Sequence, residues 1–136
     1  MAQINPYLTF AGQCREAMSF YQSCFGGELY IQTVGESPIA DQLPEDMRQL
    51  IMHASLTNEK ISIMASDMTP KGGVHTGNNV SLLVNCDSEH ELRDLFDKLA
   101  EGGEVKHPVD KTFWGALYGD LNDKYGVQWM INLNES

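Results

Sequence analysis

Hydrophobic positions follow two periods along the chain, and the two periods alternate in a fixed order. Residues 4–10 alternate apolar and polar side chains, which predicts a strand. Residues 14–25 place apolar side chains at the spacing of one buried helical face, and two glycines follow. Further strands are predicted over 28–34, 50–56 and 61–66, with a loop at 35–49 that holds one helical turn near 44–49 and a hairpin turn at 57–60.

The same order of elements begins again after a glycine- and proline-containing linker. The predicted elements of this second half are a strand at 79–85, a helix capped by Asp87 or Ser88 and ending near Ala100, and strands at 104–109, 114–121 and 127–133. Matching residues accompany the matching pattern, because Gly26-Gly27 recurs as Gly102-Gly103, 76 residues later, and Met64 recurs as Met130, 66 residues later. Asn58-Glu59-Lys60 also resembles Asn122-Asp123-Lys124. The chain is therefore predicted to be α+β, with two tandem βαβββ modules.

The predicted boundaries are 1–67 for the first module, 68–78 for the linker and 79–136 for the second module. Each module is expected to cover one face of a curved sheet with its helix. The other face would stay concave until the two modules pair and close a partial barrel. A ligand would bind in that concavity.

Composition and charge narrow the function further. The chain of 136 residues is 42% hydrophobic and carries a formal net charge of −10, so it is expected to fold and not to bind nucleic acid. The acidic surface serves solubility or favours a cationic small ligand. No secretory signal and no run of about 18 apolar residues is visible, which favours a cytoplasmic protein with no membrane partner. Its three cysteines lack a C-x-x-C pair and are expected to be free thiols.

Several stretches resemble the vicinal oxygen chelate superfamily (glyoxalase, bleomycin resistance, extradiol dioxygenase), and within it the PhnB-like branch, which carries a demethylubiquinone-methyltransferase-like domain label. The most specific of them is Asp123-Lys124-Tyr125-Gly126-Val127-Gln128-Trp129-Met130-Ile131-Asn132. The others are Pro6-Tyr7-Leu8-Thr9-Phe10, Phe25-Gly26-Gly27-Glu28, Met52-His53-Ala54-Ser55-Leu56, Met64-Ala65-Ser66-Asp67 and Phe113-Trp114-Gly115-Ala116. The resemblance implies a glyoxalase-like fold and a homodimer. A methyltransferase activity is not expected, because the chain has no G-x-G-x-x-G motif after a strand.

The resemblance also implies a place for a divalent metal. Enzymes of this superfamily hold it with a His on the first strand of a module and a Glu on the last. Those positions are expected to fall on Pro6 or Tyr7 and Met64 in the first module, and on Asn79 or Ser81 and Met130 in the second. None of these residues is His or Glu, and a thioether is a poor ligand for hard divalent ions. No metal cofactor is therefore expected.

Other residues are candidates for chemistry or for lining the cavity. His53, Asp67 and Tyr7 are candidate acid–base groups or ligands, although a hydrogen-bonded sheet histidine and a turn-starting aspartate are the competing interpretations. His75, His90 and His107 are expected to be merely exposed. The predicted cavity lining, taken from strand parity and turn position, is Thr9, Ser62, Met64, Ser66, Asn79, Ser81, Trp114, Gln128 and Met130.

Two functions remain open. The first is a cytoplasmic homodimer that binds a small molecule in a metal-free pocket, as bleomycin-resistance proteins show this fold can do. The second is a metal-dependent lyase, isomerase or dioxygenase that recruits its metal through His53, Asp67 and Tyr7. Covalent hydrolase chemistry and nucleoside-triphosphate chemistry are not expected, since neither a G-x-S-x-G elbow nor a G-x-x-x-x-G-K-[ST] loop occurs.

Overall fold

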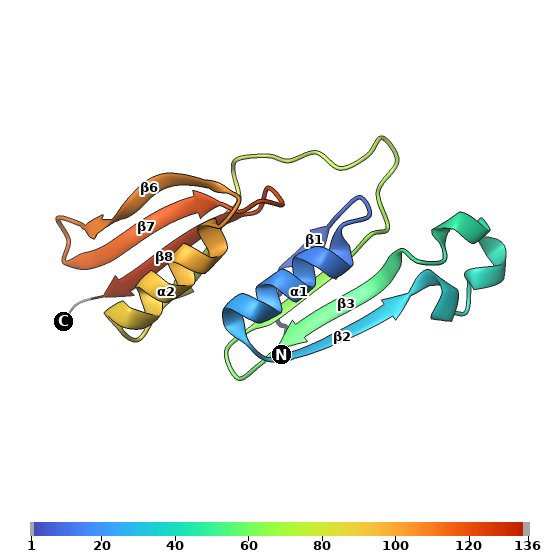
Figure 1. Ribbon diagram of the computed structural model, residues 1–136, viewed down its shortest axis with the longest axis horizontal. Helices are drawn as coiled ribbons and strands as arrows, with labels where there is room; N and C mark the ends of the chain where they lie inside the picture. Colours follow the sequence, from blue (N-terminus) through green and yellow to red (C-terminus); the bar gives the residue numbers. More distant parts are fainter. Residues whose placement is uncertain (1, 135–136) are drawn as a thin grey trace. The chain divides into compact units, whose positions relative to one another are not determined.

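The computed structural model describes residues 2–134, which form two compact units divided between His75 and Thr76 (Figure 1). The division lies inside the segment that the sequence assigns to the linker. Both units have the same order of elements, so the predicted α+β fold with two βαβββ modules is confirmed. None of the helices within residues 2–134 is long and apolar enough to cross a lipid bilayer.

The first module is a four-stranded sheet with one long helix. The strand order is β1-β4-β3-β2, in which β1 runs parallel to β4 and the other pairs are antiparallel. The elements are β1 (Tyr7–Thr9), α1 (Cys14–Phe25), β2 (Glu28–Thr33), β3 (Ile51–Thr57) and β4 (Ser62–Ser66). The loop between β2 and β3 contains three short 3-10 turns, where the sequence pattern indicates one. They are η1 (Val34–Glu36), η2 (Ala40–Gln42) and η3 (Glu45–Met47).

The second module repeats this topology, with the strand order β5-β8-β7-β6 and a parallel β5–β8 pair. Its elements are β5 (Leu82–Asn85), α2 (Glu89–Ala100), β6 (Glu104–Lys111), β7 (Ala116–Asn122) and β8 (Gln128–Asn134). In Figure 1, α2 lies against its sheet, where it contacts mainly β7 and β8, and α1 lies against its own sheet, where it contacts mainly β3 and β2.

Each helix buries one face of its own sheet and leaves the other face open. In the first module Ala17, Met18 and Tyr21 of α1 are fully buried together with Ala54 and Leu56 of β3. In the second, Leu92 and Leu99 of α2 are fully buried, as is Ile131 of β8. The alternate residues of the strands, such as Met64 and Met130, are only half-buried. The strand parity predicted from the sequence is therefore confirmed in both modules.

The same close backbone contact requires glycine at the second position of the repeated pair in both modules. A Cβ on Gly27 would lie 2.7 Å from the carbonyl oxygen of Thr57, and a Cβ on Gly103 would collide with the carbonyl oxygen of Asn122. Thr57 and Asn122 are the last residues of β3 and β7, at the start of each β-hairpin turn. The chain leaving each helix therefore passes so close to the hairpin that only glycine fits.

The strand pairing also corrects the repeat inferred from sequence. Tyr7 pairs with Met64 and Leu83 pairs with Met130, so Leu83 is the counterpart of Tyr7. Asn79 and Ser81, proposed for that position, precede β5 and are exposed. The Val80 carbonyl lies between them, and it accepts a hydrogen bond from the Gln128 side chain rather than from the backbone of a neighbouring strand.

The hairpin turns correct a second equivalence. The Asn58 amide donates to the Ile61 carbonyl, and the Asp123 amide donates to the Val127 carbonyl. Asn58 therefore corresponds to Asp123 and not to Asn122, because the second turn is one residue longer. Both side chains brace their turns, since Asn58 accepts from the amides of Lys60 and Ile61, as Asp123 does from those of Tyr125 and Val127.

The two helices begin with different caps. α1 has no side-chain cap of its own, and the buried carboxylate of Asp67 replaces it from beyond β4. One oxygen of Asp67 accepts from the amides of Gly12 and Cys14 at 2.9 and 3.0 Å, and the other accepts from the amide of Ile51 at 2.9 Å. This carboxylate therefore ties the start of α1 and the start of β3 to the end of β4.

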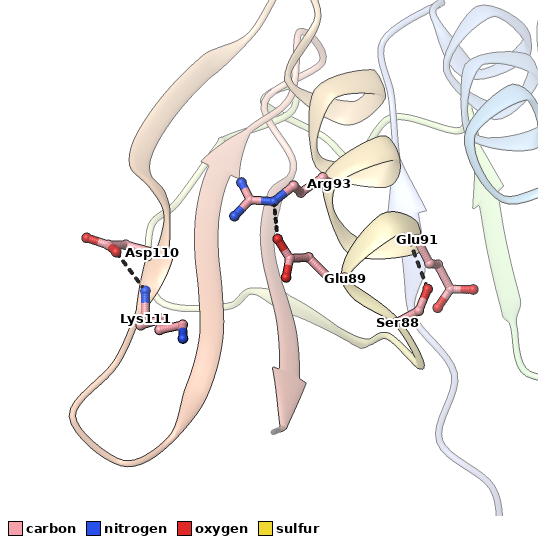
Figure 2. Close-up of polar contacts among 6 residues, drawn as sticks. All are labelled: Ser88, Glu89, Glu91, Arg93, Asp110 and Lys111. Atoms are coloured by element: carbon pink, nitrogen blue, oxygen red, sulfur yellow. Dashed lines mark hydrogen bonds and ion pairs between the residues drawn. The ribbon is translucent and has the colours of Figure 1, made fainter. Parts of the chain in front are cut away.

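α2 instead carries a local cap. Figure 2 shows the Ser88 hydroxyl oxygen, which accepts from the amide of Glu91 at 3.1 Å. The Glu91 carboxylate reaches back to the amide of Asp87, which completes a reciprocal cap. Glu89 and Arg93, one turn apart on α2, form an exposed ion pair. The side chains that stabilise the start of this helix therefore all lie within seven residues of one another.

The three cysteines form no disulfide, in agreement with the sequence-based expectation. Burial is the main cause that raises the pKa of Cys14 to about 12, and the Asp67 charge adds to it. Burial likewise raises the pKa of Cys86 to about 11, with smaller contributions from Glu91 and Asp87. Both thiols are therefore protonated at neutral pH and chemically inert.

We expect the replacement Asp67→Ala to lower the free energy of unfolding by about 3 kcal/mol, because three backbone N–H groups lose a charged acceptor. Asp41→Ala is the matched control, since the Asp41 side chain is 99% exposed, and it should change stability by less than about 0.5 kcal/mol. Urea unfolding of the two variants measures the difference. Equal transition midpoints would contradict the anchoring role of Asp67.

Cys24 is the half-buried member of the three and should be the one thiol that reacts in the native protein. We expect a maleimide at about pH 8 to label Cys24 first, and Cys14 and Cys86 only after unfolding. Mass spectrometry of the labelled peptides measures the order. Labelling that persists at the native rate in Cys24→Ser would show that a second thiol is accessible.

Candidate functional site

The open face of the first module brings together two of the residues predicted from sequence. The hydroxyl of Tyr7 on β1 lies 3.1 Å from Nδ1 of His53 on β3, and the two ring centroids are 5.8 Å apart. Met64 of β4 pairs with Tyr7 on one side and with Ser55 of β3 on the other. Tyr7 is 52% exposed, so this aromatic–imidazole pair is accessible on the open face of its sheet.

The rest of this face is small and polar or aromatic. Tyr30 of β2 pairs with Ser55 and is 57% exposed, which places a second tyrosine across the sheet from Tyr7. By strand parity the predicted lining residues Thr9 and Ser62 belong to the same face and are half-buried. Phenol, imidazole, thioether and hydroxyl groups therefore make up the centre of this surface.

Two other predicted residues of the first module do not take part in this open surface. The Asp67 carboxylate contacts the start of α1, which places it on the helix-covered side, and its oxygens are already bonded to three amides. Ser66 has the parity of the open face but is only 4% exposed. Its hydroxyl donates to the Met52 carbonyl at 2.9 Å and accepts from the Met68 amide at 2.9 Å. Both residues hold the end of β4 in place.

The open face of the second module contains a cluster that sequence reasoning missed. Asp120 of β7 pairs with Met130 of β8, and its two carboxylate oxygens are both used. The Tyr118 hydroxyl donates to one oxygen at 2.8 Å, and Nδ1 of His107 lies 2.8 Å from the other. Burial raises the pKa of Tyr118 to about 12, and the hydrogen bond to Asp120 contributes, so this hydroxyl remains a donor at neutral pH.

A signal for this cluster was present in the sequence. Tyr118 and Asp120 share strand parity, which places both side chains on one face of β7. The position of His107 depends on irregular pairing between β6 and β7, which strand parity alone does not reveal. His107 is exposed, as the sequence suggests, but its hydrogen bond to Asp120 was not predicted.

The remaining lining predictions divide into two groups. Gln128 and Met130 lie on β8 with the predicted parity and are half-buried. Trp114 lies in the turn before β7, because Thr112 and Ala116 close that turn through their backbone and the Thr112 hydroxyl. It packs edge-on against Phe113, with ring centroids 4.8 Å apart, and is 60% exposed. The strand predicted to start at Trp114 thus starts at Ala116 instead.

The metal positions implied by the superfamily can now be tested against side-chain chemistry. The first and last strands of a module are neighbours, and the paired residues there are Tyr7 with Met64, and Leu83 with Met130. A phenol, two thioethers and an alkyl group do not fit a hard divalent ion. Among residues 2–134 no group of three or more His, Cys, Asp or Glu side chains is arranged to hold a metal.

Comparison with known proteins agrees with this architecture. The 3-demethylubiquinone-9 3-methyltransferase family matches residues 2–132. Protein YjdN from Escherichia coli K12 is 34% identical over 139 aligned positions, covering 96% of this chain and 94% of YjdN. The crystal structure of protein PA1353 from Pseudomonas aeruginosa is 41% identical, with a TM-score of 0.88 and complete coverage of both chains.

More distant structures extend the likeness to the wider fold. The PhnB protein from Bacillus cereus is 29% identical with a TM-score of 0.76, and the match covers 97% of this chain and 99% of that one. A glyoxalase/bleomycin resistance protein/dioxygenase family enzyme from Burkholderia phytofirmans is 15% identical with a TM-score of 0.61, covering 97% and 96%, which shows the fold alone. The chain therefore belongs to the PhnB-like 3-demethylubiquinone-9 3-methyltransferase family, alongside YjdN, and has the glyoxalase/bleomycin-resistance fold.

Proposed function

We propose that this protein is a cytoplasmic homodimer that binds a small molecule on the open faces of its sheets without a resident divalent metal. The observation that carries the proposal is the pairing of Tyr7 with Met64 and of Leu83 with Met130, which puts aromatic, alkyl and thioether groups where the superfamily keeps metal ligands. Side chains of this kind bind organic ligands by contact and stacking. A methyltransferase reaction, which the family name suggests, has no counterpart in two mixed sheets that lack a nucleotide-binding loop.

The charge of the open faces favours a cation. The charged side chains at paired positions on these faces are acidic, namely Glu28 in the first module and Glu104, Asp110 and Asp120 in the second. Tyr7 and Tyr30 add exposed aromatic rings, which attract cations through their π faces. The formal net charge of −10 acts in the same direction over a longer range. We therefore propose a cationic, partly aromatic molecule as the ligand class.

Exposed apolar groups support the homodimer. Tyr7, Tyr30 and Leu83 lie in the strands, each more than half exposed, and not in loops. Large side chains at such positions are typical of surfaces that a partner or a ligand covers. Among symmetric homo-oligomers, the two-fold dimer is the commonest arrangement.

The alternative, an enzyme that recruits a metal through His53, Asp67 and Tyr7, is less well supported by the geometry. His53 and Tyr7 lie together, but the Asp67 carboxylate is on the helix side and is bonded to three amides. A carboxylate in that state would have to abandon the start of α1 to bind a metal. We therefore do not favour a metal-dependent reaction at this trio.

The ligand proposal is tested by calorimetric titration with a panel of cationic aromatic compounds. We expect saturable binding that Tyr7→Ala weakens by about tenfold, equivalent to about 1.4 kcal/mol, because the variant loses an aromatic contact to the cation. Ile4→Ala is the matched control, since Ile4 is 97% exposed and precedes β1, and it should leave affinity unchanged. Native mass spectrometry and elemental analysis of protein purified without chelator should show a metal-free dimer. About one metal per chain, or no saturable binder in the panel, would contradict the proposal.

A further inference from the structure

The cluster of His107, Asp120 and Tyr118 lies on the open face of the second module, where Asp120 pairs with Met130 of β8. Its three side chains come from two neighbouring strands, and its centre is a carboxylate whose side chain is only 22% exposed. The imidazole of His107, by contrast, is 76% exposed. The largely buried carboxylate of Asp120 thus contacts the exposed imidazole of His107.

The backbone of β6 is irregular on both sides of His107. The pairing between β6 and β7 shifts register between Val105 and His107, and again between His107 and Asp110. Such bulges re-aim a side chain relative to a regular ladder. Here they leave His107 paired directly with Asp120, at the distance of a charge-assisted hydrogen bond.

The hydrogen bonds fix the direction of each proton. Both oxygens of Asp120 accept, one from the Tyr118 hydroxyl and one from Nδ1 of His107, so Nδ1 carries a proton. The other nitrogen, Nε2, then has a free lone pair in neutral His107. Within residues 2–134 no hydrogen-bond partner occupies Nε2, so it is available to a ligand. A carboxylate that holds Nδ1–H in this way orients the imidazole and stabilises the imidazolium when it forms.

We propose that His107 is an acid–base residue of the second module's open face, and that Asp120 and Tyr118 are its positioning residues. This inference rests on the proposed function, because it needs a molecule bound on that face. The ligand class is a small molecule with a weakly acidic hydroxyl or thiol. Its O–H or S–H bond breaks, the proton goes to Nε2 and the electron pair stays on the oxygen or sulfur atom. Asp120 balances the imidazolium charge, and return of the proton restores the starting state.

The test uses diethyl pyrocarbonate on the whole protein and needs no ligand, so its outcome is independent of whether the proposed function is correct. The reagent is attacked by an unprotonated imidazole nitrogen, so the reaction is run at about pH 9, well above the usual range of imidazole protonation, where stabilisation of the imidazolium by Asp120 does not slow it. We expect His107 to be modified several-fold faster than His75 and His90, which are exposed residues on a loop and a helix. Mass spectrometry of the peptides gives the three rates. Asp120→Ala should reduce the His107 rate to that of the two controls.

Two further measurements make the result decisive. Asp120→Asn keeps the shape of the side chain and serves if Asp120→Ala does not fold. Long-range proton–nitrogen NMR, assigned with His107→Gln, should show the Nδ1–H tautomer in the wild type and a loss of that preference in Asp120→Ala. Equal modification rates for the three histidines, a His107 rate that neither Asp120 variant changes, or an Nε2–H tautomer would each overturn the proposal.

Discussion

Each module has one long helix for a sheet of four strands, so one face of each sheet has no helix packed on it. The side chains on that uncovered face determine most of what the chain can do. A helix shields only one face of a sheet, so the alternate residues of every strand remain on a second face. The buried face takes Ala, Leu and Ile, whereas the second takes Tyr, Ser, Met, Asn and Asp. Core packing and the polar, exposed chemistry are therefore divided between alternate positions of the same strands. Substitutions two positions apart along a strand fall on the same face of the sheet, whereas substitutions one position apart fall on opposite faces.

The local elements could be predicted because local forces define them. The helix at residues 14–25 was predicted with its observed ends, since its apolar face is continuous and glycines follow it. Strand parity placed Met64, Gln128 and Met130 on the open faces for the same reason. Strand ends were less predictable, because β5 begins only where β8 offers a partner to Leu82, and β7 begins only after the Thr112 turn closes.

Contacts between residues distant in the sequence were the part of the structure that the sequence did not predict. Asp67 resembles a turn-starting aspartate, and nothing near it in the chain indicates that its carboxylate reaches an amide 53 residues earlier. The partner of His107, Asp120, is on another strand beyond a bulge, which the sequence pattern does not reveal. The counterpart of Tyr7, however, could have been found, because Leu83 lies at the same 76-residue offset as the glycine pairs. The 76-residue repeat therefore includes the first strand of each module.

The caps of the two helices differ in the length of chain that each requires, and this has a consequence for how the protein folds. α2 is closed by groups between Asp87 and Arg93, so its first turn can be stabilised as soon as those residues are present. α1 obtains its cap from Asp67, so its first turn must wait until β4 has been added. During synthesis, the earlier helix of the chain thus gains its cap only at the end of its module, while the later helix has its cap beside its first turn. Two modules with one topology therefore cap their helices over very different lengths of chain.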